Sequence, residues 1–133
     1  MARRLTVLIT VLAALTGAAS AEAKQLTKYQ VGGGLAGLYS ELTIQTDGKA
    51  NQTGDSGEHR FTVSSKRLRA LKRALKAARF KTLKSTYKPK AQVFDGTTTV
   101  IRYRGRSVSV YSGADVPKRL ATAISRVARL MRS

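Results

Sequence analysis

Hydrophobic and polar residues alternate in short stretches over the first half of the chain, and this alternation is typical of strands with one buried face. It predicts strands over residues 25–31, 41–46 and 59–63, whose inward side chains would be Tyr29, Val31, Leu42, Ile44, Phe61 and Val63. Asp47-Gly48 predicts a hairpin turn, with the partner strand beginning near Lys49 and Ala50. The polar segment 51–58 contains two glycines and is expected to form a loose loop.

A helical period replaces the alternation further along the chain. Ser64 or Ser65 can cap a helix over residues 66–79. At 100° per residue one stripe of this helix is apolar and consists of Leu68, Leu71, Ala74, Leu75 and Ala78. Phe80 falls on the basic side, so we expect the helix to end there and both Phe80 and Leu83 to turn back into the core.

The remaining segment predicts a hairpin followed by a second helix. Residues 85–92 are expected to be a connection, 93–94 and 97–103 strand, and 107–111 a returning strand after a turn at Gly105. Asp115 is the expected N-cap of the last helix, and Pro117 suits its first turn. The apolar stripe of that helix comprises Leu120, Ile124, Val127 and Leu130 or Met131. The apolar stripes of both helices can be buried if the helices pack on the sheet. We therefore predict an α+β fold, with an antiparallel sheet of about four to five strands and two amphipathic helices packed on it.

The N-terminal residues predict export. Arg3 and Arg4 precede an apolar run over residues 5–15, and small residues around Ala21 and Ala23 form cleavage patterns. Residues 1–23 are therefore predicted to be a cleaved signal peptide, and residues 24–133 a single secreted domain. The apolar run is too short to span a bilayer, so we expect no stable membrane insertion.

Charge and cysteine content narrow the classes of partner and site. Residues 1–23 contain Arg3, Arg4 and Glu22, so the rest of the chain keeps 23 of 25 basic and 6 of 7 acidic side chains, a formal net charge of +17. A field of this size favours acidic partners such as nucleic acid, anionic membranes, cell-wall polymers or an acidic protein. The chain has no cysteine, which excludes disulfides, and its single histidine makes a protein-built zinc site improbable.

Four glycines within six residues mark the most unusual loop, Gly32-Gly33-Gly34-Leu35-Ala36-Gly37-Leu38. Exposed turns usually carry Asn, Asp, Ser or Pro rather than leucine. Two interpretations remain open: either Leu35 or Leu38 is buried in the core, or the loop protrudes and another protein binds it. The segment is not a phosphate-binding loop, because no Lys-Ser or Lys-Thr pair follows the glycines.

Catalytic chemistry is not indicated, and we expect neither enzyme activity nor a cofactor. His59 has no second imidazole to act with, and it lies between Glu58 and Arg60, as expected of a solvated strand end. Asp47, Asp95 and Asp115 occupy turn or cap positions, where their carboxylates bond the local backbone. The chain contains no Gly-x-Ser-x-Gly elbow.

The first predicted helix lies within a segment free of acidic residues, Arg60 to Lys90, which contains 12 Lys or Arg. One interpretation is a solvated face. The other is a surface for a polyanion, contributed by Arg69, Lys72, Arg73, Lys76 and Arg79. No aromatic residue interleaves with these charges between Phe61 and Phe80, so a base would have no stacking platform.

From about Tyr29 onward the chain resembles the emfourin-like family, bacterial protein inhibitors of thermolysin-like and protealysin-like metalloproteases. The resemblance rests on Gly33-Gly34-Leu35-Ala36-Gly37 after an early strand, the Leu68 to Leu83 helix pattern, the hairpin containing Gly105, and Gly113 and Pro117 before the closing helix. It implies a non-enzymatic inhibitor that occludes a protease cleft. From the shape of the loop alone, we expect Gly33, Gly34, Leu35, Ala36 and Gly37 to contact the partner. The alternative function is a secreted cationic module for polyanions. The sequence specifies neither the target protease nor an oligomeric state.

Overall fold

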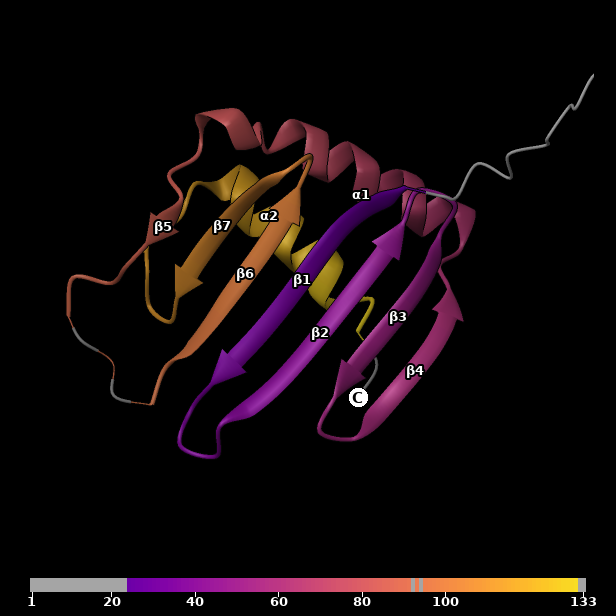
Figure 1. The fold of residues 1–133 in the computed structure, drawn as a ribbon. Coiled ribbons are helices and arrows are strands. Elements are labelled where there is room, and N and C mark those ends of the chain that lie inside the picture. The colour runs from indigo at the N-terminus through magenta and orange to yellow at the C-terminus, as the bar shows by residue number, and fades with distance from the viewer. Residues whose placement is uncertain (1–23, 92, 94, 132–133) are drawn as a thin grey trace, which may run out of the picture.

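In a computed structural model, which describes residues 24–91, 93 and 95–131, one seven-stranded sheet carries two helices on a single face (Figure 1). The strand order across the sheet is β4-β3-β2-β1-β6-β7-β5. The strands are β1 Gln25–Gly33, β2 Leu38–Gln45, β3 Lys49–Gly54, β4 Gly57–Thr62, β5 Thr86–Tyr87, β6 Thr97–Tyr103 and β7 Arg106–Tyr111. The α+β class is confirmed, and residues 1–23, with the predicted signal peptide, lie outside the described part.

The sheet is larger than the sequence predicted, and it is mixed. Residues 51–58 are not a loose loop, because β3 and β4 pair through them and turn at residues 55–56. Residues 51–58 lack the apolar alternation that marks a strand, so the pattern did not indicate this part of β3 and β4. β5 lies within the expected connection and pairs parallel with β7, from Thr86 opposite Ser109. Val93 lies outside any strand, and Phe94 lies outside the described residues.

The predicted turns and both helices are present. Gly48 has φ of 94°, and its amide donates to the Gln45 carbonyl at 3.0 Å, which closes the Asp47-Gly48 turn. The helices are α1 Ser65–Ala77 and α2 Lys118–Ala128, with a short 3-10 turn, η1 Phe80–Thr82, between α1 and β5. Ser64 caps α1 by accepting a hydrogen bond from the Arg67 amide. Asp115 is not the N-cap of α2, because that position belongs to Pro117, which makes no side-chain cap.

The core lies between the helices and the inner face of the sheet. The apolar stripes contribute Leu68, Leu71, Leu75, Ala78, Leu120, Val127 and Leu130, and the sheet contributes Tyr29, Leu42, Ile44, Ile101, Tyr103 and Val108. Arg79 takes a left-handed conformation with φ of 50°, which reverses the chain after α1. Phe80 therefore turns inward as predicted and packs 5.3 Å from the Tyr103 ring, between centroids.

Two arginines from distant segments donate hydrogen bonds to backbone carbonyls at and just beyond the C-terminal end of α1. Arg119 Nε donates to the Ala78 carbonyl at 3.0 Å, and its Nη2 donates to Thr82 Oγ1 at 3.1 Å. Arg106 Nη1 donates to the Lys81 carbonyl at 2.9 Å. Cations at this end of a helix satisfy free carbonyls and interact favourably with the helix dipole.

We expect Arg119→Met to lower the free energy of unfolding by about 1 kcal/mol, because it removes both hydrogen bonds and the charge at the α1 terminus. Chemical denaturation would measure the change. Lys118→Met removes the neighbouring exposed cation and is the matched control, for which a change within about 0.5 kcal/mol is expected. Equal effects of the two substitutions would contradict the capping role of Arg119.

The opposite face of the sheet carries no helix in the described part of the chain (Figure 1). Most of its side chains are polar or charged, among them Lys28, Gln30, Glu41, Thr43, Asn51, Arg60 and Arg102, and Val100 of β6 also lies on this face. Neither helix in the described ranges is long and apolar enough to cross a membrane.

Candidate functional site

The loop between β1 and β2 is a tight turn built on glycines. Backbone φ angles of 103° at Gly33, 79° at Gly34 and 60° at Gly37 lie in the left-handed region, which glycine adopts without steric cost. The Gly37 amide donates to the Gly34 carbonyl at 3.1 Å. This hydrogen bond closes a four-residue turn and places Leu35 and Ala36 at its tip.

Neighbouring segments hold the loop on both sides. The Gly34 amide donates to the Gly96 carbonyl at 3.3 Å, and a Cβ on Gly33 would lie only 3.1 Å from the same oxygen. On the other side the Tyr39 amide donates to Asp55 Oδ2 at 3.2 Å, in the turn between β3 and β4. These hydrogen bonds to neighbouring segments restrict the conformational freedom of the turn.

Both leucines of the loop face outward. Leu35 is 89% exposed and Leu38 is 60% exposed. The interpretation in which either leucine is tucked into the core is therefore wrong. The other candidate contacts, Gly33, Gly34, Ala36 and Gly37, are exposed as well.

The large exposed hydrophobic residues gather at one end of the sheet. In the described part of the chain they are Leu35, Leu38, Tyr39, Val93 and Tyr111. At this end β1 and β7 finish and β2 and β6 begin, as their pairing registers show. Figure 1 shows the β1–β2 loop, the β3–β4 turn and the segment before β6 at this same end of the strands. We call these five residues and the turn Gly33–Gly37 the glycine-loop end.

A polar network on the open face of the sheet supports the start of β2. Tyr39 donates its hydroxyl proton to Glu41 Oε2, and Gln30 Nε2 donates to the same oxygen at 2.8 Å and to the Tyr39 hydroxyl at 3.0 Å. Lys28 Nζ lies 3.3 Å from the other carboxylate oxygen, Oε1. Tyr39 is thus fixed by β1 and β2 together, and it orients the chain that leads into the loop.

The network shifts two pKa values in opposite directions. The hydrogen bond from Tyr39, then that from Gln30 and the charge of Lys28, lower the pKa of Glu41 from 4.5. The same hydrogen bond to Glu41 raises the pKa of Tyr39 from 10.0, because removing the phenolic proton would place two anions side by side.

We expect Glu41→Gln to flatten the stability of the protein in acid. A carboxyl whose pKa is lowered by folding stabilises the fold above its unfolded pKa, here about 4.5, and this contribution is lost as the pH falls through the folded value. The wild-type melting temperature should therefore drop more steeply than that of the variant below about pH 4.5. Thermal melts from about pH 2 to 7 measure this difference.

Glu58→Gln is the matched control for Glu41→Gln. Glu58 pairs with Arg60 at 2.8 Å, but its side chain is 49% exposed, against 21% for Glu41. Solvent screening makes such exposed pairs weak, so the control should keep the acid sensitivity of the wild type. Parallel curves for the wild type and Glu41→Gln would contradict the role given to the network.

A hollow of about 580 Å³ adjoins the loop at the same end of the sheet. It is lined by Lys88, Pro89, Lys90, Val93, Gly96, Thr97, Thr98, Tyr111 and Ser112. Lys88 Nζ lies 5.6 Å from the centroid of the Tyr111 ring, a cation–π distance. The hollow offers apolar surface beside positive charge, next to the protruding turn.

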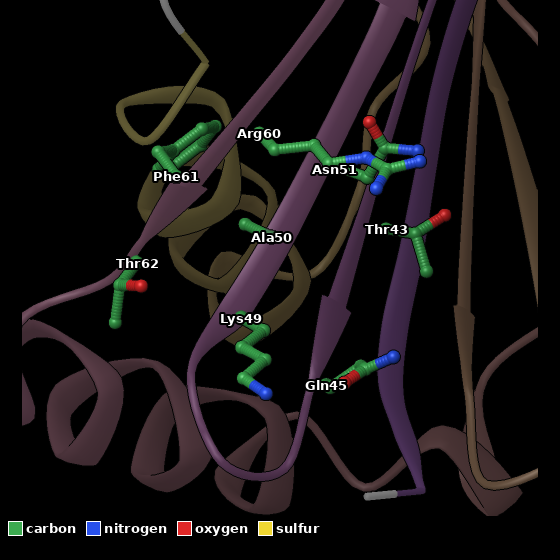
Figure 2. A pocket seen from close by; sticks show the side chains of 8 residues that line it. All are labelled: Thr43, Gln45, Lys49, Ala50, Asn51, Arg60, Phe61 and Thr62. Carbon is green, nitrogen blue, oxygen red and sulfur yellow. The ribbon is translucent and has the colours of Figure 1, made fainter.

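A second hollow, of about 520 Å³, lies on the open face of β2, β3 and β4 (Figure 2). Lys49, Arg60, Gln45, Asn51, Thr43 and Thr62 supply its polar groups, together with Ala50 and Phe61. Figure 2 shows the Phe61 ring lying away from the Arg60, Asn51 and Thr43 side chains. The residues that line this hollow include no carboxylate and no imidazole. They therefore do not form an acid–base pair for catalysis. No group of three or more metal-ligating side chains occurs within the described ranges.

The basic residues selected from the sequence lie away from the glycine-loop end. Arg69, Lys72, Arg73 and Lys76 project from the exposed side of α1, and Arg79 follows it. Lys72 Nζ donates to the Thr46 carbonyl at 2.9 Å, so this lysine also ties α1 to the β2–β3 turn. The two candidate surfaces are therefore separate parts of the molecule.

The sequence did not single out Val93, Tyr111 or the Tyr39–Glu41 network. Tyr39 and Glu41 are two residues apart on one strand, a spacing that places both on one face and could have indicated their contact. Val93 and Tyr111 join the loop only through the order of the strands, which the local pattern does not contain.

Residues 36–131 match the model of a protein family described as Domain of unknown function (DUF6438). The chain belongs to this family. The match contains the helices, strands β2 to β7 and the second half of the glycine turn, whereas β1 and Leu35 precede it. No curated protein matches the sequence.

Proposed function

We propose that this protein is a non-enzymatic inhibitor of thermolysin-like metalloproteases, and that its glycine-loop end occludes the protease cleft. The observation that carries the proposal is the 89% exposure of Leu35 at the tip of an anchored turn. Because nearly the whole Leu35 side chain is in contact with water, its transfer into an apolar pocket of a partner would gain the hydrophobic free energy of burial.

The anchoring of the turn favours tight binding. Association costs free energy when loops and side chains become ordered. The hydrogen bonds from Gly34 to Gly96 and from Tyr39 to Asp55 already fix the turn, so less conformational freedom is lost when a partner closes around it. Protease inhibitors typically present a preorganised surface of this kind.

The surroundings of Leu35 resemble an interface in composition. Leu38, Tyr39, Val93 and Tyr111 supply further apolar area, and Lys88 and Lys90 lie beside it. Interfaces commonly combine an apolar centre with a polar rim. Leu35 is therefore the proposed anchor, its apolar neighbours extend the proposed centre, and Lys88 and Lys90 belong to the proposed rim.

The proposed mechanism is steric and involves no covalent step. The turn occupies the cleft and excludes substrate, while the rigid sheet behind it prevents the loop from adapting to the geometry of a cleavable peptide. The positive charge of the protein accelerates the encounter with an acidic protease, because electrostatic steering acts mainly on the association rate.

Titration of the purified protein against a panel of thermolysin-like metalloproteases tests this function. We expect a stoichiometric loss of peptide hydrolysis for at least one of them, and the inhibitor should remain uncleaved after long incubation. The absence of inhibition at micromolar concentration across the panel would contradict the proposal.

A further inference from the structure

All charged side chains of the two helices are cationic. Together with Arg129, the C-cap of α2, the helices carry ten Lys or Arg side chains and no Asp or Glu. The described carboxylates lie on strands and turns instead, at Glu41, Asp47, Asp55, Glu58, Asp95 and Asp115. The charge of the molecule is thus divided between a mixed sheet side and a positive helix side.

Helix stability does not account for the cations at the start of α1. Lys66 and Arg67 occupy the first turn of α1, where the dipole favours acidic residues, and the first turn contains none. Ser64 is the N-cap and Arg67 is the third helical residue, the position at which Glu would complete a capping box. Residues that oppose a local rule are expected where function requires them.

Cations from both helices meet in one groove. The first turn of α1 lies against the end of α2, and Lys66, Arg67, Arg126 and Arg129 line a hollow of about 340 Å³ with Ala70 and Leu130. At the other end Arg119, in the first turn of α2, reaches the Ala78 carbonyl. The helices therefore run antiparallel, and the cations of α2 lie beside the two ends of α1.

We propose that this helix layer binds the phosphate backbone of a double-stranded nucleic acid without reading its bases. Packed helices lie about 8–10 Å apart. This is a distance between helix axes, and the long Lys and Arg side chains that project from them can reach phosphates on both sides of a duplex groove, which is about 6 or 12 Å wide. Phosphate contacts alone give sequence-independent affinity with a strong salt dependence.

Two other anionic partners fit the layer less well. The first is a membrane surface, on which an interfacial helix must insert its apolar face into the bilayer. The leucines and the valine of the helix layer, such as Leu71 and Val127, are buried against the sheet and cannot insert. α1 and α2 contain no aromatic residue, so the unstacked bases of a single strand would find no platform.

The test compares two double variants of the full chain that alter the formal charge equally. Lys66→Glu with Arg67→Glu removes two cations from the groove. Lys49→Glu with Arg102→Glu removes two exposed cations from the open face of the sheet. Binding to a 25-base-pair duplex labelled with fluorescein is measured by fluorescence anisotropy over a range of salt concentrations, with thermal melts of each protein.

The wild type should bind the duplex at about 0.15 M salt, and the groove variant should bind roughly 30-fold more weakly, with a salt slope reduced by about 2, since two phosphate contacts are lost. The sheet variant should lose less than about threefold, because screening limits the effect of charges beyond roughly 8 Å. The melting temperature of the groove variant should not fall, since acidic residues suit the start of α1.

Equal losses in the two variants would overturn the proposal, because net charge alone would then account for binding. It would also be overturned if the wild type did not bind the duplex at this salt concentration. None of these outcomes affects protease inhibition, which is assigned to the glycine-loop end.

Discussion

Replacing Leu71 by alanine is expected to lower the free energy of unfolding by about 2–5 kcal/mol. Leu71 lies in the middle of the apolar stripe of α1 and is 1% exposed, among buried residues of both helices and the sheet. Truncation leaves a cavity that the surrounding residues fill only in part. For a single domain this loss is a large share of the total stability. Urea denaturation measures the change.

Leu35→Ala is the matched control, since it makes the same chemical change at a site that is 89% exposed. We expect its free energy of unfolding to stay within about 0.5 kcal/mol of the wild type. A loss for Leu35→Ala as large as that for Leu71→Ala would mean that the loop packs against the core in solution, and this would contradict the exposed turn.

The second large effect is expected in partner binding. Leu35→Ala should weaken inhibition of a susceptible metalloprotease by at least about 1 kcal/mol, or roughly fivefold, because it removes the apolar anchor from the tip of the turn. Its melting temperature should remain within a few degrees of the wild-type value. Inhibition constants and thermal melts on the same protein preparations measure both properties.

Thr62→Ala is a suitable control for the binding measurement. Thr62 is exposed and pairs with Lys49 at the opposite end of the sheet from the glycine turn, so its truncation should leave the inhibition constant unchanged. If Thr62→Ala and Leu35→Ala weakened inhibition equally, the anchor would not be Leu35. An unchanged inhibition constant for Leu35→Ala would exclude it directly.

The helices and the central hairpins were predictable because their signals are local. The stripe from Leu68 to Ala78 repeats with the helical period, and burial of its leucines follows from that repeat. The inward turn of Phe80 was also predictable, since a residue on the basic side of the helix can reach the core only if the helix ends. The Asp47-Gly48 turn has a similarly local chemical basis.

Other features depend on tertiary context and were beyond the sequence pattern. β3 and β4 pair although the segment is polar, because an open sheet face demands no apolar residues there. β5 consists of Thr86 and Tyr87 alone and forms only because β7 offers it an edge. Asp115 was a good N-cap candidate by residue type, but Pro117 holds the position without a side-chain cap.

The candidate site was predictable only in its central segment. The glycines and leucines of the loop are adjacent in sequence, so their unusual composition could be recognised directly. Whether the leucines are exposed became known only from the structure. Val93 and Tyr111 are far from the loop in sequence, and only the placement of β6 and β7 beside β1 brings them to the same end of the sheet. Local sequence patterns therefore indicated the glycine loop but not the residues that surround it in the fold.

The most direct measurement is the amide hydrogen-exchange footprint of the protein in complex with the metalloprotease that it inhibits most strongly. Occlusion by the glycine-loop end predicts slower exchange at residues 33–39, and at Gly96 and Thr97 beside the turn, with unchanged exchange in α1 and α2. Protection confined to the helices, with no change at residues 33–39, would contradict the account.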